Sequence, residues 1–184
     1  MSHEKFHIAL SHAILAGTGI YCLIQIKDQN FICPHVTYGL IAINNIIGVY
    51  RWASDYNTKI LEVYRFTAYC QLLFALPCIT TTVWLQNGYS KDWSWAWALV
   101  PIFPLLCYLV NADLDLPLAE LLILFNLVGL GVVCFVKEIQ YGLAATLAYT
   151  ISHCCIRQLA LYNYGLCFFA YFALRAIGFG HDLV

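Results

Sequence analysis

Residues 118–136 read LAELLILFNLVGLGVVCFV, nineteen positions with a single charge, Glu120. A helix of this length is about 30 Å long, which matches the hydrocarbon core of a bilayer. An open sheet leaves backbone groups without partners in lipid, so a helix is the expected structure. The run therefore predicts a membrane-spanning helix.

The rest of the chain has a similar character, since 62% of the 184 residues are hydrophobic and only 10% are charged. The charges punctuate apolar runs that are long enough to cross a bilayer. We therefore expect an all-α fold, a polytopic transmembrane helical bundle that forms a single domain over residues 1–184. The expected spans are about 6–26, 35–53, 58–85, 93–110, 118–136, 139–159 and a short seventh ending near 177.

The C-terminal part leaves the number of spans open. A turn near Asn163 admits the seventh span, but the last 40 residues also fit one spanning helix and one interfacial helix, which gives six spans. Local signals place some of the helix ends more firmly. Asn57 or Thr58 is expected to cap the third span, Pro77 to kink it, and Pro117 to lie in the first turn of the fifth.

Composition argues against several classes of function. The net charge is −1 with acids and bases interspersed, so no nucleic-acid partner is expected. Most of the nine cysteines lie inside apolar runs, where thiols pack as small residues, and no cofactor is expected. For a metal, the weak candidates are Asp113 and Asp115 in an acidic turn, where solvated turn residues are the simpler interpretation, and a headgroup enzyme could add His12 and His153 to them.

Polar residues suggest one candidate site. Threading seven spans through the membrane brings most of the arginines and the inner histidines toward the N-terminal side. Such residues normally face the interior of a bundle, because a charge in hydrocarbon costs several kcal/mol. The candidate polar cluster comprises His12, Asn44, Arg51, Glu62, Glu120, His153 and Arg157.

Helical spacing supports this cluster on two spans. In the second span Asn44, Gly48 and Arg51 share a face, and the glycine permits close approach of another helix. In the sixth span a stripe runs from Thr146 through His153 to Arg157.

The charges have alternative interpretations. Arg51 and Arg157 lie near helix ends, where snorkelling to headgroups is routine. If they are instead partly buried, they need carboxylate partners, and Glu62 and Glu120 are nearest in depth. Glu62 also has the spacing for a surface pair within its own helix, and Glu120 for an electrostatic interaction with a helix N-terminus.

His153 is the best single candidate for a functional side chain. An imidazole at that depth can act as a ligand, a base or a proton relay. The simpler interpretation is a hydrogen-bonded histidine in the bundle, with Asn44 likewise bonded across helices.

A few short segments resemble a known family. They are Ala9-Leu10-Ser11-His12 at the start of the first span, Tyr141-Gly142 in the sixth and Arg157 near its end, about a sixth of the chain. These segments resemble the small multipass family around transmembrane protein 276. The resemblance implies a multipass membrane protein and brings no active-site residues with it.

Three classes of function remain. The first, which the minimal loops and the absence of a catalytic motif favour, is a non-catalytic accessory factor or subunit of a membrane complex. Its partners are then the lipid bilayer and another membrane protein. The second is a small carrier or channel for a polar solute or ion, and the third is an intramembrane enzyme acting on a lipid headgroup. We expect an integral, multipass location in an endomembrane, the endoplasmic reticulum or Golgi, ahead of the plasma membrane.

Overall fold

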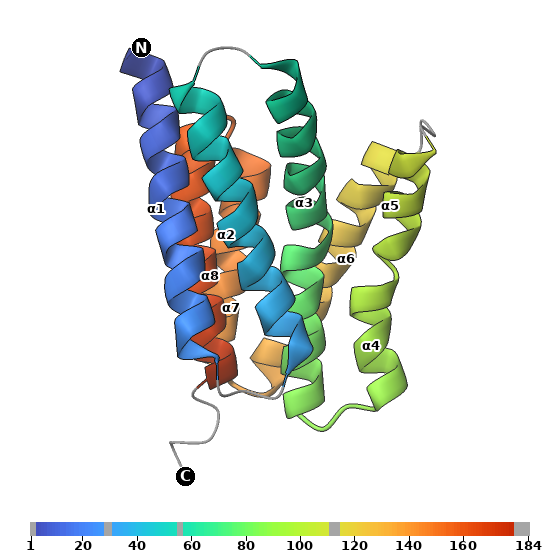
Figure 1. Cartoon of the computed structure of the whole chain (residues 1–184). Coiled ribbons are helices and arrows are strands. Elements are labelled where there is room, and N and C mark those ends of the chain that lie inside the picture. The colour runs from blue at the N-terminus through green and yellow to red at the C-terminus, as the bar shows by residue number, and fades with distance from the viewer. Residues whose placement is uncertain (1–2, 28–30, 55–56, 111–114, 179–184) are drawn as a thin grey trace.

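The computed structural model describes residues 3–27, 31–54, 57–110 and 115–178, and these residues are helical throughout apart from short turns. The helices pack side by side as an elongated bundle (Figure 1). Their bounds are α1 His3–Gln25, α2 Ile32–Ala53, α3 Thr58–Gln86, α4 Lys91–Leu99, α5 Ile102–Leu109, α6 Asp115–Val136, α7 Gln140–Thr150, the π-helical turn η1 Ile151–Cys155, and α8 Leu159–Gly178.

Five of these helices are long and apolar enough to cross a membrane: α1, α2, α3, α6 and α8. The expected count of seven spans is therefore too high for continuous helices. Residues 93–110 divide into α4 and α5, because Pro101 and Pro104 remove backbone N–H donors where one helix would continue. Residues 139–159 yield only the eleven residues of α7 and the five of η1.

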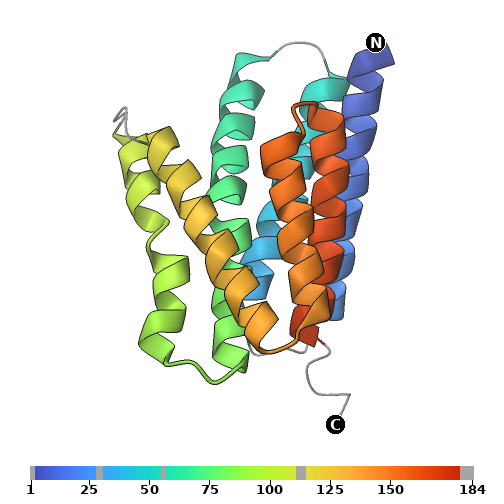
Figure 2. The same cartoon turned by 180° about the vertical axis from the view of Figure 1, so that it is seen from behind.

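The divided segments still connect the two ends of the bundle. α4 and α5 follow one another along one edge of the molecule, and α7 with η1 lies against α8 (Figures 1 and 2). As a result, the start of α1, the end of α2 and the start of α3 lie at one end, while the end of α1, the start of α2 and the α3–α4 connection lie at the other.

Local sequence signals account for the longest helix. Asn57 caps α3 as expected, because its side chain accepts hydrogen bonds from the backbone N–H groups of Lys59 (3.0 Å) and Ile60 (3.4 Å). The helix then runs unbroken through Pro77, which is buried in its interior. Pro77 therefore does not end the helix.

α8 differs from expectation at its start. The turn predicted near Asn163 lies instead at residues 156–158, and Asn163 is inside the helix. Asn163 and Gly165 mark helix contacts: Asn163 donates to Ser11 Oγ of α1 at 3.0 Å, and a Cβ at Gly165 would collide with Ser152 of η1. Residues typical of turns are used here for close packing.

The apolar core lies between α1, α2, α3, α6, α7 and α8. Tyr38, Tyr149 and Phe169 are its largest fully buried side chains. The two short helices α4 and α5 contribute little to it, because within them only Ser94, Ala98 and Pro104 are buried.

Candidate functional site

His12 lies at the centre of a buried polar network between α1, α2 and α3. Its side chain is 1% exposed. Nδ1 lies 2.6 Å from Asn45 Oδ1 of α2, and Nε2 lies 3.4 Å from the Tyr64 hydroxyl of α3. The His12 and Tyr64 rings meet edge to face, with centroids 5.7 Å apart. One histidine thus joins three helices.

The partners of Asn45 assign the protons on His12. The Asn45 amide nitrogen donates to the Ile41 carbonyl at 2.7 Å and to Gln71 Oε1 at 3.1 Å, so its oxygen is the acceptor. His12 Nδ1 therefore carries the hydrogen and donates to Asn45. A neutral imidazole then has Nε2 as its acceptor, 3.4 Å from the Tyr64 hydroxyl.

The network continues along α2 and α3. Asn44 Nδ2 donates to Gln71 Oε1 at 2.9 Å, and the Thr67 hydroxyl donates to Asn44 Oδ1, also at 2.9 Å. Each bond pairs a donor of one side chain with an acceptor of another, so the groups satisfy one another away from water. The members of this His12 network are His12, Asn44, Asn45, Tyr64, Thr67 and Gln71.

Gly48 makes this arrangement sterically possible. A Cβ at Gly48 would lie 2.5 Å from His12 Nδ1 and 2.7 Å from Cγ, far inside van der Waals contact. The imidazole therefore lies against bare backbone of α2. The prediction that Gly48 permits close helix approach on the Asn44 face is confirmed.

Arg51 stands one turn beyond Gly48, at the end of α2. Its guanidinium carbon lies 4.5 Å from the centroid of the Tyr64 ring and 4.8 Å from that of the Trp52 ring. These distances are those of cation–π contacts. Tyr64 thus contacts both Arg51 and His12, so His12, Asn44 and Arg51 lie in one region of the structure.

The other predicted charges form no ion pairs within the described residues. Glu62, Glu120 and Arg157 are exposed. Within the described part of the chain, neither these three nor Arg51 forms an ion pair, so the predicted pairing of Arg51 or Arg157 with Glu62 or Glu120 is absent. The two carboxylates lie on outward faces of α3 and α6, where solvation or headgroups replace a partner.

His153 lies in η1 and not in the His12 network. It is half-buried and stacks on Tyr149, with ring centroids 6.0 Å apart. The stripe predicted to extend to Arg157 is interrupted, because the π-helical turn changes the helical period and Ile156 is already extended. Thr146 and Thr150 bond back to their own helix, at Gly142 and Thr146.

The two candidate metal ligands of the acidic turn cannot be placed from the described residues. Asp113 lies outside the described residues, and α6 begins at Asp115, whose side chain is likewise outside them. Across the described ranges, no group of three or more His, Cys, Asp or Glu side chains is placed to hold a metal.

Four network members were not predicted from the sequence: Asn45, Tyr64, Thr67 and Gln71. A signal existed for two of them. Gln71 is an amide within a long apolar span, and Asn45 adjoins Asn44, so either can be read as a polar group that needs a buried partner. Tyr64 and Thr67 are ordinary residues in such spans and carry no comparable signal.

Two buried polar groups, one on α3 and one on α6, have no hydrogen-bond partner among the described residues. Thr81 Oγ1 and Asn126 Oδ1 make no hydrogen bond within the described structure, although both residues are at least 99% buried. The indole N–H of Trp84 donates to the Gly129 carbonyl at 3.1 Å, one turn further along each helix. The two orphan groups therefore lie at the same level of this interface.

Replacing Thr81 with valine is expected to raise stability by about 1 kcal/mol, because an unpaired buried hydroxyl costs about that much. Thermal unfolding of purified protein in mild detergent measures the change. Thr80→Val is the matched control, since the Thr80 hydroxyl already donates to the Leu76 carbonyl at 3.1 Å and its loss should bring no gain. A destabilised Thr81→Val variant would mean that a ligand or water holds the hydroxyl.

Comparisons with known proteins return nothing: no family model, curated protein or solved structure matches this chain. The resemblance to the family around transmembrane protein 276 therefore stays a prediction.

Proposed function

We propose that this chain is an integral, multipass membrane protein that crosses the bilayer seven times. The five long apolar helices support membrane insertion. The α4–α5 pair and the α7–η1 segment are then two further, interrupted passes, since each connects the same two ends of the bundle as its long neighbours (Figures 1 and 2).

We further propose that it acts as a non-catalytic accessory or subunit of a membrane complex. One observation carries this proposal: the side chains of the His12 network are hydrogen-bonded to one another. Asn45 bonds both His12 and Gln71, and Gln71 in turn bonds Asn44. Side chains paired in this way stabilise helix packing, whereas a transport path or an active site needs polar groups directed at a solute.

The edge of the bundle supports a protein partner. α5 is exposed along most of its length, with Phe103 and Leu109 at 61% and 58% and only Pro104 buried. The residues at its junction with α4, Leu99 and Val100, are also exposed. Interrupted helical backbone at membrane depth is normally covered by protein, because lipid offers no hydrogen bonds.

Affinity purification from native membranes in mild detergent tests the proposal. We expect a stoichiometric membrane protein partner, identified by mass spectrometry. A variant with Phe103→Ser and Leu106→Ser on the exposed face of α5 should lose that partner, while Leu121→Ser and Leu124→Ser on exposed α6 should retain it. A monodisperse particle that contains this chain alone would contradict the proposal and favour the carrier or the headgroup enzyme.

A further inference from the structure

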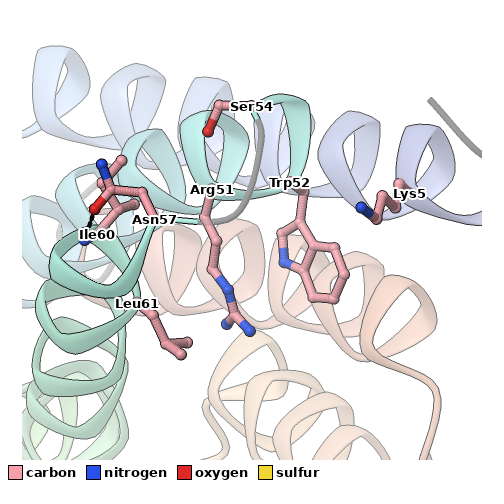
Figure 3. Close-up of a pocket in the computed structure, with 7 residues that line it drawn as sticks. All are labelled: Lys5, Arg51, Trp52, Ser54, Asn57, Ile60 and Leu61. Atoms are coloured by element: carbon pink, nitrogen blue, oxygen red, sulfur yellow. Dashed lines mark hydrogen bonds between the residues drawn. The ribbon is translucent and has the colours of Figure 1, made fainter.

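A small cavity opens at the N-terminal end of the bundle, where α2 ends and α3 begins. Its volume is about 120 Å³. Figure 3 shows the Arg51 and Trp52 side chains side by side in it, with Leu61 on the Arg51 side and Lys5 beyond the indole. The lining residues are Lys5, Arg51, Trp52, Ser54, Asn57, Ile60 and Leu61.

The lining combines positive charge with hydrogen-bonding groups. Arg51 and Lys5 are cationic side chains, and Asn57 and Ser54 add polar ones. In the described residues Arg51 has no carboxylate partner, so its charge is not neutralised by the protein there. A half-buried, unneutralised guanidinium is costly and favours an anion at this place.

The aromatic contacts orient Arg51 for that anion. The centroids of the Tyr64 and Trp52 rings lie 4.5 Å and 4.8 Å from the guanidinium carbon. These are cation–π contacts, which do not use the N–H groups of the guanidinium. The five N–H groups of a guanidinium lie in its plane and match the geometry of a phosphate, which binds in a bidentate manner. Cation–π contact and phosphate binding are therefore compatible.

Trp52 supplies a second donor. Its indole nitrogen is buried and makes no hydrogen bond in the described structure. Figure 3 shows this nitrogen on the side of the indole that faces Arg51. An acceptor placed against Arg51 thus satisfies two groups that otherwise remain without one.

We propose that this cavity binds the headgroup phosphate of an anionic phospholipid. The site lies at the end of three apolar helices, the level at which tryptophan and arginine meet headgroups in a bilayer. The inference rests on membrane insertion but not on the existence of a protein partner. The two proposals can therefore fail separately.

Native mass spectrometry of the protein released from nanodiscs tests the site. The nanodiscs contain phosphatidylcholine with phosphatidic acid or phosphatidylserine. We expect the wild-type chain to retain the anionic lipid and Arg51→Gln to bind it about tenfold more weakly, since a charge-assisted bond is lost. Arg175→Gln is the matched control, because Arg175 also lies over a tyrosine, Tyr141, at 5.5 Å, at the opposite end of the bundle.

Two further variants keep the test decisive if Arg51→Gln does not fold. Arg51→Lys keeps the charge but loses the bidentate fork, so it should bind more weakly than wild type. Trp52→Phe keeps a ring and removes the N–H, so it should bind several-fold more weakly.

Three results would overturn the proposal. The first is equal lipid retention in wild type, Arg51→Lys and Trp52→Phe. The second is equal weakening by Arg175→Gln, which marks a general charge effect. The third is displacement of the lipid by millimolar inorganic phosphate with matching thermal stabilisation in pure phosphatidylcholine, which identifies a site for free phosphate.

Discussion

Replacing Gly48 with alanine is expected to destabilise the bundle by about 1–3 kcal/mol, the usual cost of overpacking a tight contact. The new Cβ would lie 2.5 Å from His12 Nδ1. The imidazole cannot turn aside without cost, because both of its nitrogens are hydrogen-bonded. α1 and α2 must therefore separate, or His12 must give up its bonds. Thermal unfolding in mild detergent measures the loss.

Gly39→Ala is the control for this experiment. Gly39 lies on the same helix, and a Cβ there meets nothing within 4 Å. Alanine at that position should be neutral or stabilise by about 0.5–1 kcal/mol, since glycine is a poor helix former. Equal stability of the two variants would disprove close packing between Gly48 and His12.

Asn45→Leu is expected to lower the free energy of unfolding by about 1–3 kcal/mol. The lower part of that range is typical of hydrogen bonds in membrane interiors. The change leaves the His12 Nδ1–H without its acceptor and removes one donor from Gln71. Asn126→Leu is the matched control, because the Asn126 oxygen has no partner in the described structure and only its bond to Leu122 is lost. The Asn126→Leu variant should lose clearly less stability than Asn45→Leu.

The double variant His12→Leu/Asn45→Leu separates the bond from the side chains. If the two residues are paired, the double variant should lose less unfolding free energy than the two single variants lose together. The difference should be about 0.5 kcal/mol or more. Strict additivity would mean that the 2.6 Å contact contributes no coupling energy.

The sequence predicts the helices better than their interruptions. Apolar length alone identifies α6 and α3, because hydrocarbon thickness sets a length that the runs match. The same reasoning overestimates residues 93–110, where two prolines divide the run, and it misplaces the start of α8. Asn163 and Gly165 favour a turn in water, but in this bundle they serve contact with Ser11 and Ser152.

Part of the candidate site could also be predicted. Asn44, Gly48 and Arg51 follow from helical spacing, and His12 follows from its position toward the N-terminal side of the first span, since polar residues of a span turn toward the interior. The outward positions of Glu62 and Glu120 could not be predicted in this way. Depth along a span places Glu62 near Arg51, but the direction of a side chain depends on rotation of the helix, which a single sequence does not determine here. The predicted stripe through His153 to Arg157 is absent for a related reason, because the helical period changes locally in η1.

The packing of α1 against α8 has a consequence for how the chain assembles. α1, which is synthesised before α8, bonds it through Asn163 to Ser11 and through the Cys22 thiol to the Ala170 carbonyl at 3.8 Å. The Ala170 carbonyl also accepts a hydrogen bond from the Tyr38 hydroxyl of α2 at 3.3 Å. Until α8 leaves the ribosome, Tyr38 and Cys22 lack these partners. Nascent chains that stop before α8 should therefore keep these polar groups of α1 and α2 without partners, a mark by which membrane quality control can distinguish chains that lack α8 from chains that contain it.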